Sequence, residues 1–533
     1  MKKTFKKLMA ALLAVALLCA MAVPAFAASA KDQTHSFTAY QIFSGTNSTD
    51  ESDTALGNIQ WGSGVNPQAF LTALKADETI GTDFNGIEFS DAACARKVAA
   101  VVAEKYTDNS AKATIFARIA YANKASSSAT GSGSVNIENA GYYLFVDTTA
   151  FDASATDSVF GLALLKVAKN NSTVTPTVKA AQPTVTKTVY DDDDGDQKGF
   201  SDTNADFGKS ADHAINESFQ FKLTAVIPAN DNFGAYKQYK VIFHDSMSEG
   251  ITFESLESVK ITSNGTTTDV TSSANKSIDN GTAGAADWTL TIDDIKTAVP
   301  GIDLTNGATV EVIYNAHLNE KAYVNTADGP TTNKNTVYLA YSNNPNAGSE
   351  NSTGKTPEEA VYVFTYQITN TKYKNDVNDN NKLAGAKFRL YSDKECTNEV
   401  KLYQGTDGFY YPIKSGKTSV TSVEMVSDDN GAFNIKGLDA GIYYLRETGT
   451  PDGFNTCEDI KIVISASHKR TGDQSSKVEL NGSENMANNV INKTGATLPS
   501  TGGMGTTLFY VIGGGLMVAA VVLLVTKKRM ENK

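Results

Sequence analysis

Hydrophobic and polar residues alternate with period two over much of the chain, and this pattern predicts β-strands with one buried face. Helical patterns almost vanish between residues 183 and 346, so this segment predicts an antiparallel β-sandwich. The polar, turn-rich stretch at 343–360 marks a linker, and a second sandwich is expected from about 361 to 493. The clearest alternating runs are SFQFKLTAVI at 218–227, YKQYKVIFHD at 236–245, ATVEVIYNAHL at 308–318 and NTVYLAYSN at 335–343.

The first part of the chain mixes both periodicities. HSFTAYQIF at 35–43 and AGYYLFVDTT at 140–149 alternate like strands, whereas apolar residues recur with helical spacing at Pro67–Lys75, Ala92–Tyr106 and Ala113–Ala122. We therefore predict a mainly β fold with three tandem Ig-like β-sandwich domains, the first of which carries added helices. The expected domain bounds are 28–180, 181–350 and 358–495.

Two apolar segments flank these domains. Residues 1–27 combine four lysines with an apolar stretch and the small-residue site Ala25-Phe26-Ala27, which is typical of a secretory signal peptide. Leu508–Val525 is an apolar run of 18 residues that spans about 27 Å as a helix, just under a bilayer core of about 30 Å. The basic residues Lys527–Arg529 follow it and favour a cytoplasmic tail, so we expect a transmembrane helix.

The pentapeptide Leu498-Pro499-Ser500-Thr501-Gly502 precedes this apolar run. It resembles the LPxTG sorting signal of Gram-positive surface proteins, in which a sortase cysteine attacks the threonine carbonyl and an amine resolves the acyl-enzyme. The resemblance implies that residues 498–533 form a sorting signal and that the chain is linked covalently through Thr501 to peptidoglycan or to another subunit. The alternative is an ordinary C-terminal membrane anchor.

Charge and cysteine content narrow the possible functions. The chain has 47 basic and 59 acidic residues, a formal net charge of −12, and becomes more acidic when the lysine-rich leader is removed. This charge disfavours binding to nucleic acid or to anionic membrane surfaces. Three cysteines lie outside the leader. Of these, Cys396 and Cys457 fall in one domain, where they form either a disulfide or two isolated buried thiols, and Cys94 belongs to a helical pattern.

No pattern indicates a cofactor or an enzyme acting on an external substrate. The five histidines are scattered singly and do not have zinc-ligand spacing. The stretches Asp191–Asp194 and Asn375–Asn381 suggest calcium, but neither has the glycine and glutamate positions of an EF-hand loop. We interpret both as hydrated turns and predict no metal site.

The sequences LAGAKFRLY at 383–391 and GIYYLRETGTPDGF at 441–454 resemble the collagen-adhesin B-type repeats of Gram-positive surface proteins. The chain between leader and anchor resembles a major fimbrial shaft subunit, or backbone pilin. In that family a strand lysine joins an asparagine with the help of a buried acid. The resemblance implies two intramolecular isopeptide bonds, whose members in the order lysine, asparagine and acid are Lys372, Asn492 and Glu447, and Lys187, Asn335 and Asp245.

Burial explains why these residue types are needed. An apolar environment lowers a lysine pKa and raises a carboxyl pKa by up to about 3–5 units, so a neutral amine can attack while the acid stays protonated. Period two places Asp245 on the same face as Val241 and Phe243. The alternatives are a surface ion pair between Lys372 and Glu447, and an exposed Asp245 at a strand end.

The first domain departs from this scheme. In its GYYLFVD segment, the register of the glutamate box places Val146 where the acid belongs, and Asp147 follows one residue late on the other face. We therefore predict that the first domain forms no such bond.

The family also places an acceptor lysine just before the second domain. Lys179 lies between Pro176 and Pro183, which keep the segment extended and accessible to an enzyme. Lys166 and Lys169 are rival acceptors, and a solvated linker lysine is the plain alternative.

These residues together indicate a backbone pilin on the Gram-positive cell wall, in which sortase joins Thr501 to Lys179 of the next subunit. The resemblance implies several partners: pilus-specific and housekeeping sortases, identical subunits arranged head to tail, minor pilins and peptidoglycan, with membrane anchoring only before sorting. A monomeric wall-anchored adhesin and a tip or base pilin are the alternatives.

Overall fold

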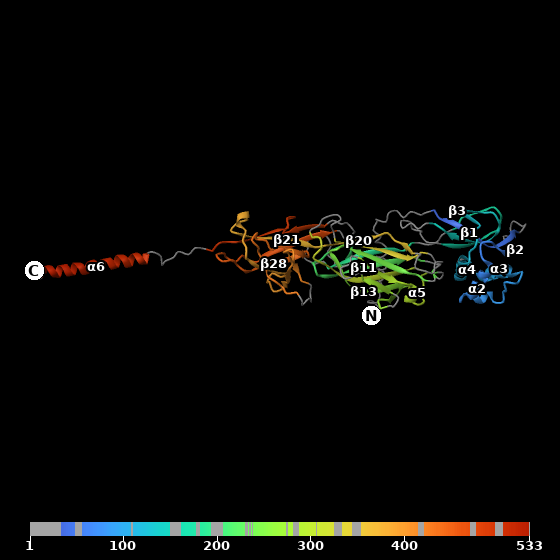
Figure 1. The fold of residues 1–533 in the computed structure, drawn as a ribbon, viewed down its shortest axis with the longest axis horizontal. Coiled ribbons are helices and arrows are strands. Elements are labelled where there is room, and N and C mark those ends of the chain that lie inside the picture. The colour runs from blue at the N-terminus through green and yellow to red at the C-terminus, as the bar shows by residue number, and fades with distance from the viewer. Residues whose placement is uncertain are drawn as a thin grey trace, which may run out of the picture.

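The domains of the protein lie in a row, with the N-terminal domain at one end and a long helix at the other (Figure 1). The leader, Lys179 and Leu498–Gly502 lie outside the described residues. The computed structural model describes residues 34–47, 56–107, 110–149, 161–176, 182–192, 206–229, 233, 236, 238–272, 276–280, 287–304, 306–324, 333–343, 353–413, 420–468, 476–495 and 505–531.

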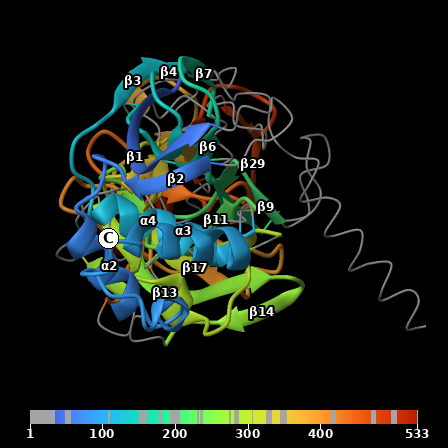
Figure 2. The same ribbon diagram turned by 90° about the vertical axis from the view of Figure 1, so that its right-hand side faces the viewer.

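The N-terminal domain is built around one five-stranded sheet with the order β2-β1-β5-β6, to which β3 adds by pairing with β1. Three helices cover one face of this sheet (Figure 2), and a two-stranded sheet of β4 and β7 packs on the other. The predicted helices are confirmed. The strands are β1 (Ser36–Asn47), β2 (Leu56–Trp61), β3 (Ala129–Ser132), β4 (Val135–Ile137), β5 (Gly141–Asp147), β6 (Leu162–Val167) and β7 (Ser172–Val174), and the helices are α2 (Pro67–Ala76), α3 (Cys94–Lys105) and α4 (Ala111–Ala122).

The middle domain is a sandwich of two sheets whose inner faces share one core. Its first sheet has the order β10-β20-β18-β12-β16-β15, and β19 pairs with β18. These strands are β10 (Ser210–Asp212), β12 (Val241–Met247), β15 (Lys276–Asn280), β16 (Asp287–Ile292), β18 (Asn333–Ser342), β19 (Thr353–Lys355) and β20 (Glu359–Phe364).

The facing sheet has the order β14-β13-β17-β11-β8-β9. Its long strands alternate buried and partly exposed residues, as the period-two pattern predicts. The strands are β8 (Thr184–Asp191), β9 (Asp206–Gly208), β11 (Ser218–Ile227), β13 (Ile251–Ser263), β14 (Thr266–Asp269) and β17 (Ala308–Leu318), and the short helix α5 (Ile295–Ala298) leads towards β17.

The boundary between the middle and C-terminal domains differs from the expected one. The end of the expected linker forms β19 and the start of β20, and β20 pairs antiparallel with β18 from Asn333↔Val363 to Val337↔Glu359. The middle domain therefore extends to Phe364. This residue lies past 350, the predicted end of the middle domain, and past 358, the predicted start of the C-terminal domain. The sequence pattern did not predict that β20 belongs to the middle domain. Polar residues precede β20, and the strand with which it pairs lies elsewhere in the chain.

The C-terminal domain is also a two-sheet sandwich, with the orders β24-β25-β27-β21-β31 and β23-β22-β28-β29-β30, and β26 pairs with β22. Its first and last strands, β21 and β31, are parallel neighbours. The strands are β21 (Tyr366–Lys374), β22 (Lys387–Tyr391), β23 (Glu399–Val400), β24 (Leu402–Gln404), β25 (Tyr410–Pro412), β26 (Met425–Val426), β27 (Ile435–Leu438), β28 (Gly441–Gly449), β29 (Ile460–His468), β30 (Ser476–Leu480) and β31 (Ala487–Asn492).

The middle and C-terminal domains meet in direct contact. The Ile215 amide donates to the Gly437 carbonyl at 2.8 Å, and the Asn216 side chain donates to the Pro412 carbonyl at 2.9 Å. Gly437 has a φ of +84°, and a Cβ atom there would lie 2.4 Å from the Ile215 side chain. Glycine therefore permits both the backbone conformation and the close approach of the domains.

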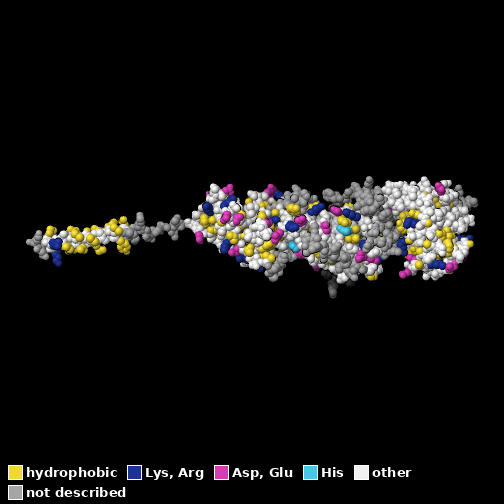
Figure 3. Space-filling model, in the orientation of Figure 1, with side chains coloured by type: hydrophobic (Ala, Val, Ile, Leu, Met, Phe, Trp, Pro, Cys, Tyr) yellow, Lys and Arg dark blue, Asp and Glu magenta, His cyan; other side chains and the backbone are white. Residues whose placement is uncertain are grey.

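Helix α6 (Gly505–Glu531) extends beyond the C-terminal domain. An 18-residue stretch within Leu508–Glu531 has a mean hydropathy of 2.6, and this helix is long and apolar enough to cross a membrane. Figure 3 shows apolar side chains along the helix and basic side chains near its far end. The expected C-terminal apolar helix is confirmed.

Candidate functional site

The middle domain brings Lys187, Asp245 and Asn335 together in its core. Lys187 lies on β8 among inward-facing valines, while Asp245 and Asn335 lie on neighbouring strands β12 and β18 of the facing sheet. Lys187 and Asn335 are 0% exposed, and Asp245 is 2% exposed. The inward face predicted for Asp245 is confirmed, and an exposed aspartate at a strand end is excluded.

A tyrosine hydroxyl links these three side chains. Tyr314 on β17 donates to both Asp245 carboxylate oxygens at 3.1 Å, and its oxygen accepts from Lys187 Nζ at 3.0 Å and from Asn335 Nδ2 at 2.7 Å. Lys187 Nζ also contacts Asp245 directly. Sequence reasoning missed Tyr314, although period two in ATVEVIYNAHL places it on the inward face with Val310 and Val312.

The low polarity of this site favours the neutral forms of the lysine and the acid. Burial lowers the pKa of Lys187 to about 8, against the opposing effect of Asp245. Burial also raises the pKa of Asp245. The Nζ atom lies 5.2 Å from the Phe221 ring centroid, and Asn335 Oδ1 is buried with no hydrogen-bond partner among the described residues.

The C-terminal domain assembles a second set from Lys372, Glu447 and Asn492. Lys372 on β21 and Asn492 on β31 lie on parallel neighbouring strands, and Glu447 comes from β28 in the other sheet. Lys372 and Asn492 are 0% exposed, and the Glu447 side chain is buried. These positions exclude a surface ion pair between Lys372 and Glu447.

Here the amine and the amide are in direct contact. Lys372 Nζ lies 2.5 Å from Asn492 Oδ1, and Asn492 Nδ2 donates to Glu447 Oε1 at 2.7 Å. The second Glu447 oxygen accepts from the Cys457 amide at 2.8 Å. Burial lowers the pKa of Lys372. The carboxyl of Glu447 therefore lies beside the amide nitrogen of Asn492.

The acid of the first domain has different neighbours. Asp147 is 3% exposed, lies 2.6 Å from His35 Nδ1 and accepts from the Thr149 amide at 2.9 Å. Val146 packs in the helix-side core of the sheet, while the neighbouring strand residue Phe145 packs in the core on the opposite face. The absence of a bond in this domain stays a prediction.

The residues of the proposed sortase reactions are only partly described. Lys166 on β6 and Lys169 after it are exposed. Lys179 and Leu498–Gly502 lie outside the described residues, so the choice of acceptor stays a prediction.

Within the described residues Cys94, Cys396 and Cys457 are free thiols, and no disulfide joins Cys396 to Cys457. Their sulfur atoms have different partners. Cys457 Sγ lies 3.8 Å from Lys372 Nζ, and Cys396 Sγ lies 3.8 Å from Asp459 Oδ2. Burial raises the pKa of Cys457 to about 11 and also raises the pKa of Cys396. In the structure the pair therefore consists of two separate thiols, of which Cys396 is buried and Cys457 is partly exposed.

Comparison with known families supports the assignment of the C-terminal region. Residues 369–477 match the SpaA family model, a prealbumin-like fold domain, and residues 491–532 match the LPXTG cell wall anchor motif. The chain is a cell wall-anchored surface protein. Its prealbumin-like domain contains Lys372 and Glu447, and its anchor implies a sortase substrate. A search of curated proteins gave no match.

Solved structures with similarity to the chain include three pilins. The T6 backbone pilin of serotype M6 Streptococcus pyogenes is 18% identical with a TM-score of 0.43, covering 81% of this chain and 78% of that one. The 35 kDa C-terminal fragment of the major pilin GBS80 of Streptococcus agalactiae is 21% identical with a TM-score of 0.40, covering 59% and 100%. The full-length major pilin SpaD from Corynebacterium diphtheriae is 16% identical with a TM-score of 0.40, covering 71% and 86%.

We predict that Cys94, Cys396 and Cys457 all react with iodoacetamide in the denatured chain without prior reduction. In the native chain at pH 8, Cys457 should react at least tenfold more slowly than after denaturation, because the thiolate is the reactive form and burial disfavours it. Peptide mapping of the full chain in detergent measures both. Labelling of Cys396 and Cys457 only after reduction would show that they form a disulfide.

Proposed function

We propose that this protein is the backbone subunit of a covalently polymerised pilus, whose middle and C-terminal domains are each closed by a lysine–asparagine isopeptide bond. The observation that carries the proposal is the burial of two complete lysine–acid–asparagine sets, one in each sandwich. A buried lysine and acid are costly to retain for stability alone. Their position beside a buried asparagine favours a chemical role.

In the C-terminal domain the reaction begins with the neutral Lys372 amine, which burial favours. Its Nζ attacks Asn492 Cγ, the Nζ–Cγ bond forms, and the Cγ–Nδ2 bond breaks. Glu447 lies 2.7 Å from Nδ2, so its carboxyl can pass a proton to the departing nitrogen and regain one from the attacking amine. The products are one amide and one ammonia, with no change in oxidation state.

In the middle domain Lys187 provides the attacking amine, Asn335 provides the amide that is attacked, and Asp245 acts as the acid. Tyr314 adds a positioning role, because its hydroxyl contacts all three side chains. Asn335 Oδ1 has no hydrogen-bond partner among the described residues. It is therefore open to a proton from Asp245 as negative charge develops on the amide oxygen.

Polymerisation uses two sites on the chain, one before the middle domain and one after the C-terminal domain. Sortase forms an acyl-enzyme at Thr501, and the Lys179 amine of the next subunit resolves it, which gives a head-to-tail contact that repeats without closing. The domains in a row provide the shape of a shaft (Figure 1). The identity of the acceptor rests on the sequence between Pro176 and Pro183.

We predict that the intact chain has a mass lower than its sequence mass by two ammonias. Peptide mapping should join Lys187 to Asn335 and Lys372 to Asn492. Substituting Asp245→Ala should restore one ammonia and leave the C-terminal bond intact, and Glu447→Ala should do the reverse, because each acid serves one domain. Mass spectrometry of the full chain in detergent measures this, and the unmodified mass in the wild type would exclude both bonds.

We predict that Tyr314→Phe slows bond formation in the middle domain by roughly tenfold, because it removes the hydroxyl that positions all three side chains, and a tenfold change in rate corresponds to about 1.4 kcal/mol. Cell-free synthesis of the full chain followed by timed mass spectra measures the rate.

Tyr239→Phe is the matched control for this experiment. Tyr239 is buried in the same core, where its ring packs against Phe233 and Tyr236. The C-terminal bond serves as an internal control in the same molecule. Equal slowing in both tyrosine variants would contradict a positioning role for Tyr314.

We predict that Lys179→Arg converts the ladder of polymers released from the cell wall into monomer, because arginine cannot resolve the acyl-enzyme. Lys166→Arg and Lys169→Arg keep the charge at the rival positions and should leave the ladder unchanged. Immunoblots of wall extracts from a Gram-positive host carrying the cognate sortase measure this. A wild-type chain that gives only monomer would favour the monomeric adhesin, and a ladder that survives Lys179→Arg would identify another acceptor.

A further inference from the structure

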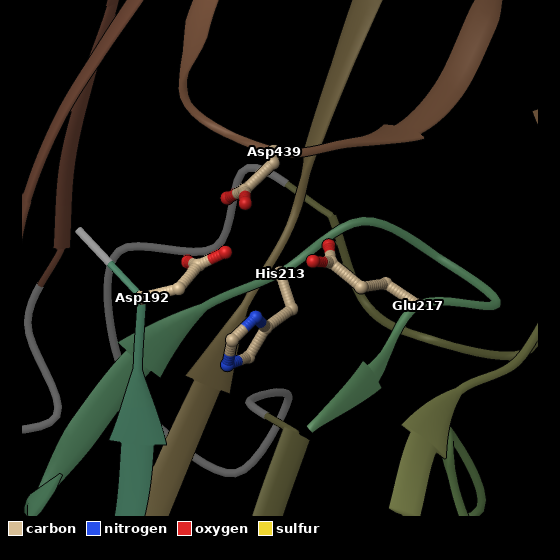
Figure 4. Close-up of side chains that lie close together, drawn as sticks. All are labelled: Asp192, His213, Glu217 and Asp439. Carbon is tan, nitrogen blue, oxygen red and sulfur yellow. The ribbon is translucent and has the colours of Figure 1, made fainter. Parts of the chain in front are cut away.

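Four side chains that are distant in the sequence converge where the middle and C-terminal domains meet. Asp192 follows β8, His213 follows β10, Glu217 precedes β11, and Asp439 lies between β27 and β28. One potential ligand atom from each residue lies within 4.8 Å of every other (Figure 4). The first three residues belong to the middle domain and Asp439 to the C-terminal domain, so the cluster spans the junction.

His213 presents an unused nitrogen to this cluster. The residue is 1% exposed, and its Nε2 lies 2.7 Å from the Tyr190 carbonyl oxygen. Because a carbonyl only accepts hydrogen bonds, Nε2 carries a proton, and in the neutral imidazole the lone pair is then on Nδ1. Nδ1 is buried and has no hydrogen-bond partner in the described part of the chain. Figure 4 shows one ring nitrogen facing the carboxylates, and with Nε2 bound to Tyr190 this nitrogen is Nδ1.

The surroundings hold this imidazole in the geometry of a metal ligand. Its ring stacks on Phe219 with a centroid distance of 4.2 Å and an interplanar angle of 4°. Histidines that bind metals usually donate their other N–H to a carboxylate or a backbone carbonyl, which fixes the tautomer. The hydrogen bond to Tyr190 has this role.

Backbone amides also orient two of the carboxylates. Glu217 Oε2 accepts from the Ala214 amide at 3.0 Å, and Asp439 Oδ1 accepts from the Ala440 amide at 2.8 Å. Three carboxyl groups this close repel one another when ionised. Burial, reinforced by the charge of Asp192, raises the pKa of Glu217 to about 7. A bound cation would offset this repulsion.

We propose that Asp192, His213, Glu217 and Asp439 bind one divalent transition-metal ion of the Mn²⁺ or Zn²⁺ class, which joins the middle domain to the C-terminal domain. The imidazole ligand favours this class over Ca²⁺, which takes oxygen ligands. The ion would add ligand bonds to the backbone contact between Ile215 and Gly437. It would therefore fix the relative orientation of the two domains.

A neighbouring cluster contains a histidine whose two ring nitrogens both have hydrogen-bond partners. His468 Nδ1 lies 2.8 Å from Ser210 Oγ, and its Nε2 lies 3.2 Å from Asp212 Oδ1. Both ring nitrogens of His468 therefore have hydrogen-bond partners. The unpartnered Nδ1 distinguishes His213 from it.

The test is a Mn²⁺ titration of the full chain in detergent, after treatment with EDTA and dialysis. Electron paramagnetic resonance measures free and bound Mn²⁺, and pulsed spectra detect ¹⁴N coupling from an imidazole ligand. We expect one tight Mn²⁺ per chain with nitrogen coupling, displaced by Zn²⁺ at lower concentration than by Ca²⁺. His213→Ala should abolish the coupling and weaken binding at least tenfold.

Two further variants separate ligand loss from misfolding. Glu217→Gln and Asp439→Asn keep the shape of each side chain and should each weaken Mn²⁺ binding at least tenfold with an unchanged circular dichroism spectrum. His244→Ala removes a histidine that stacks on Tyr338, outside the cluster, and should bind Mn²⁺ like the wild type. Wild-type binding no tighter than that of the two carboxyl variants, or bound Mn²⁺ without nitrogen coupling, overturns the proposal.

Discussion

The burial of an amine and a carboxylic acid in one apolar core is the constraint on which the rest of this structure depends. Ionised, both groups would lose their hydration, and their mutual attraction offsets this loss only in part, so burial lowers the pKa of Lys187 and raises that of Asp245. Such an environment exists only after two sheets have closed on each other, because Lys187 and Asp245 come from opposite sheets. Folding therefore precedes and controls the proposed chemistry, and the unfolded chain carries only an ordinary lysine and an ordinary acid.

The strand order determines what the proposed bonds would do mechanically. In the C-terminal domain the bond would join the first and last strands and close a loop of 120 residues, an effect of about 5 kcal/mol on the unfolded chain if it acts as a disulfide does. In the middle domain Asn335 lies on β18, and the strands β19 and β20 follow it along the chain. With both bonds formed, a tensile force along the chain would pass through the bond from Lys187 to Asn335. It would continue through β20 and then pass through the bond from Lys372 to Asn492. Most strands of both sandwiches would carry no load.

Period two was sufficient to predict which residues face the core, but not which inward-facing residues meet. The inward positions of Lys187, Asp245 and Tyr314 all follow from alternation, yet only Lys187 and Asp245 also matched a family pattern, so Tyr314 was missed. The sequence analysis did not assign β20 to the middle domain, because a polar segment separates β20 from its partner strand β18. The proposed metal site was not predicted for a related reason: Asp439 lies beside His213 only through the contact between two domains, and no local spacing encodes that contact.

The first domain lies outside the part of the chain that would carry tension in the proposed fibre. If Lys179 accepts Thr501 of the preceding subunit, tension enters each subunit at Lys179 and leaves at its own Thr501, so residues before Lys179 lie outside the loaded path. A domain in that position needs no covalent closure. Its buried acid, Asp147, accordingly lies against His35, and helices cover one face of its sheet. Both sandwiches, in contrast, lie between the two attachment points, and each contains a complete lysine–acid–asparagine set.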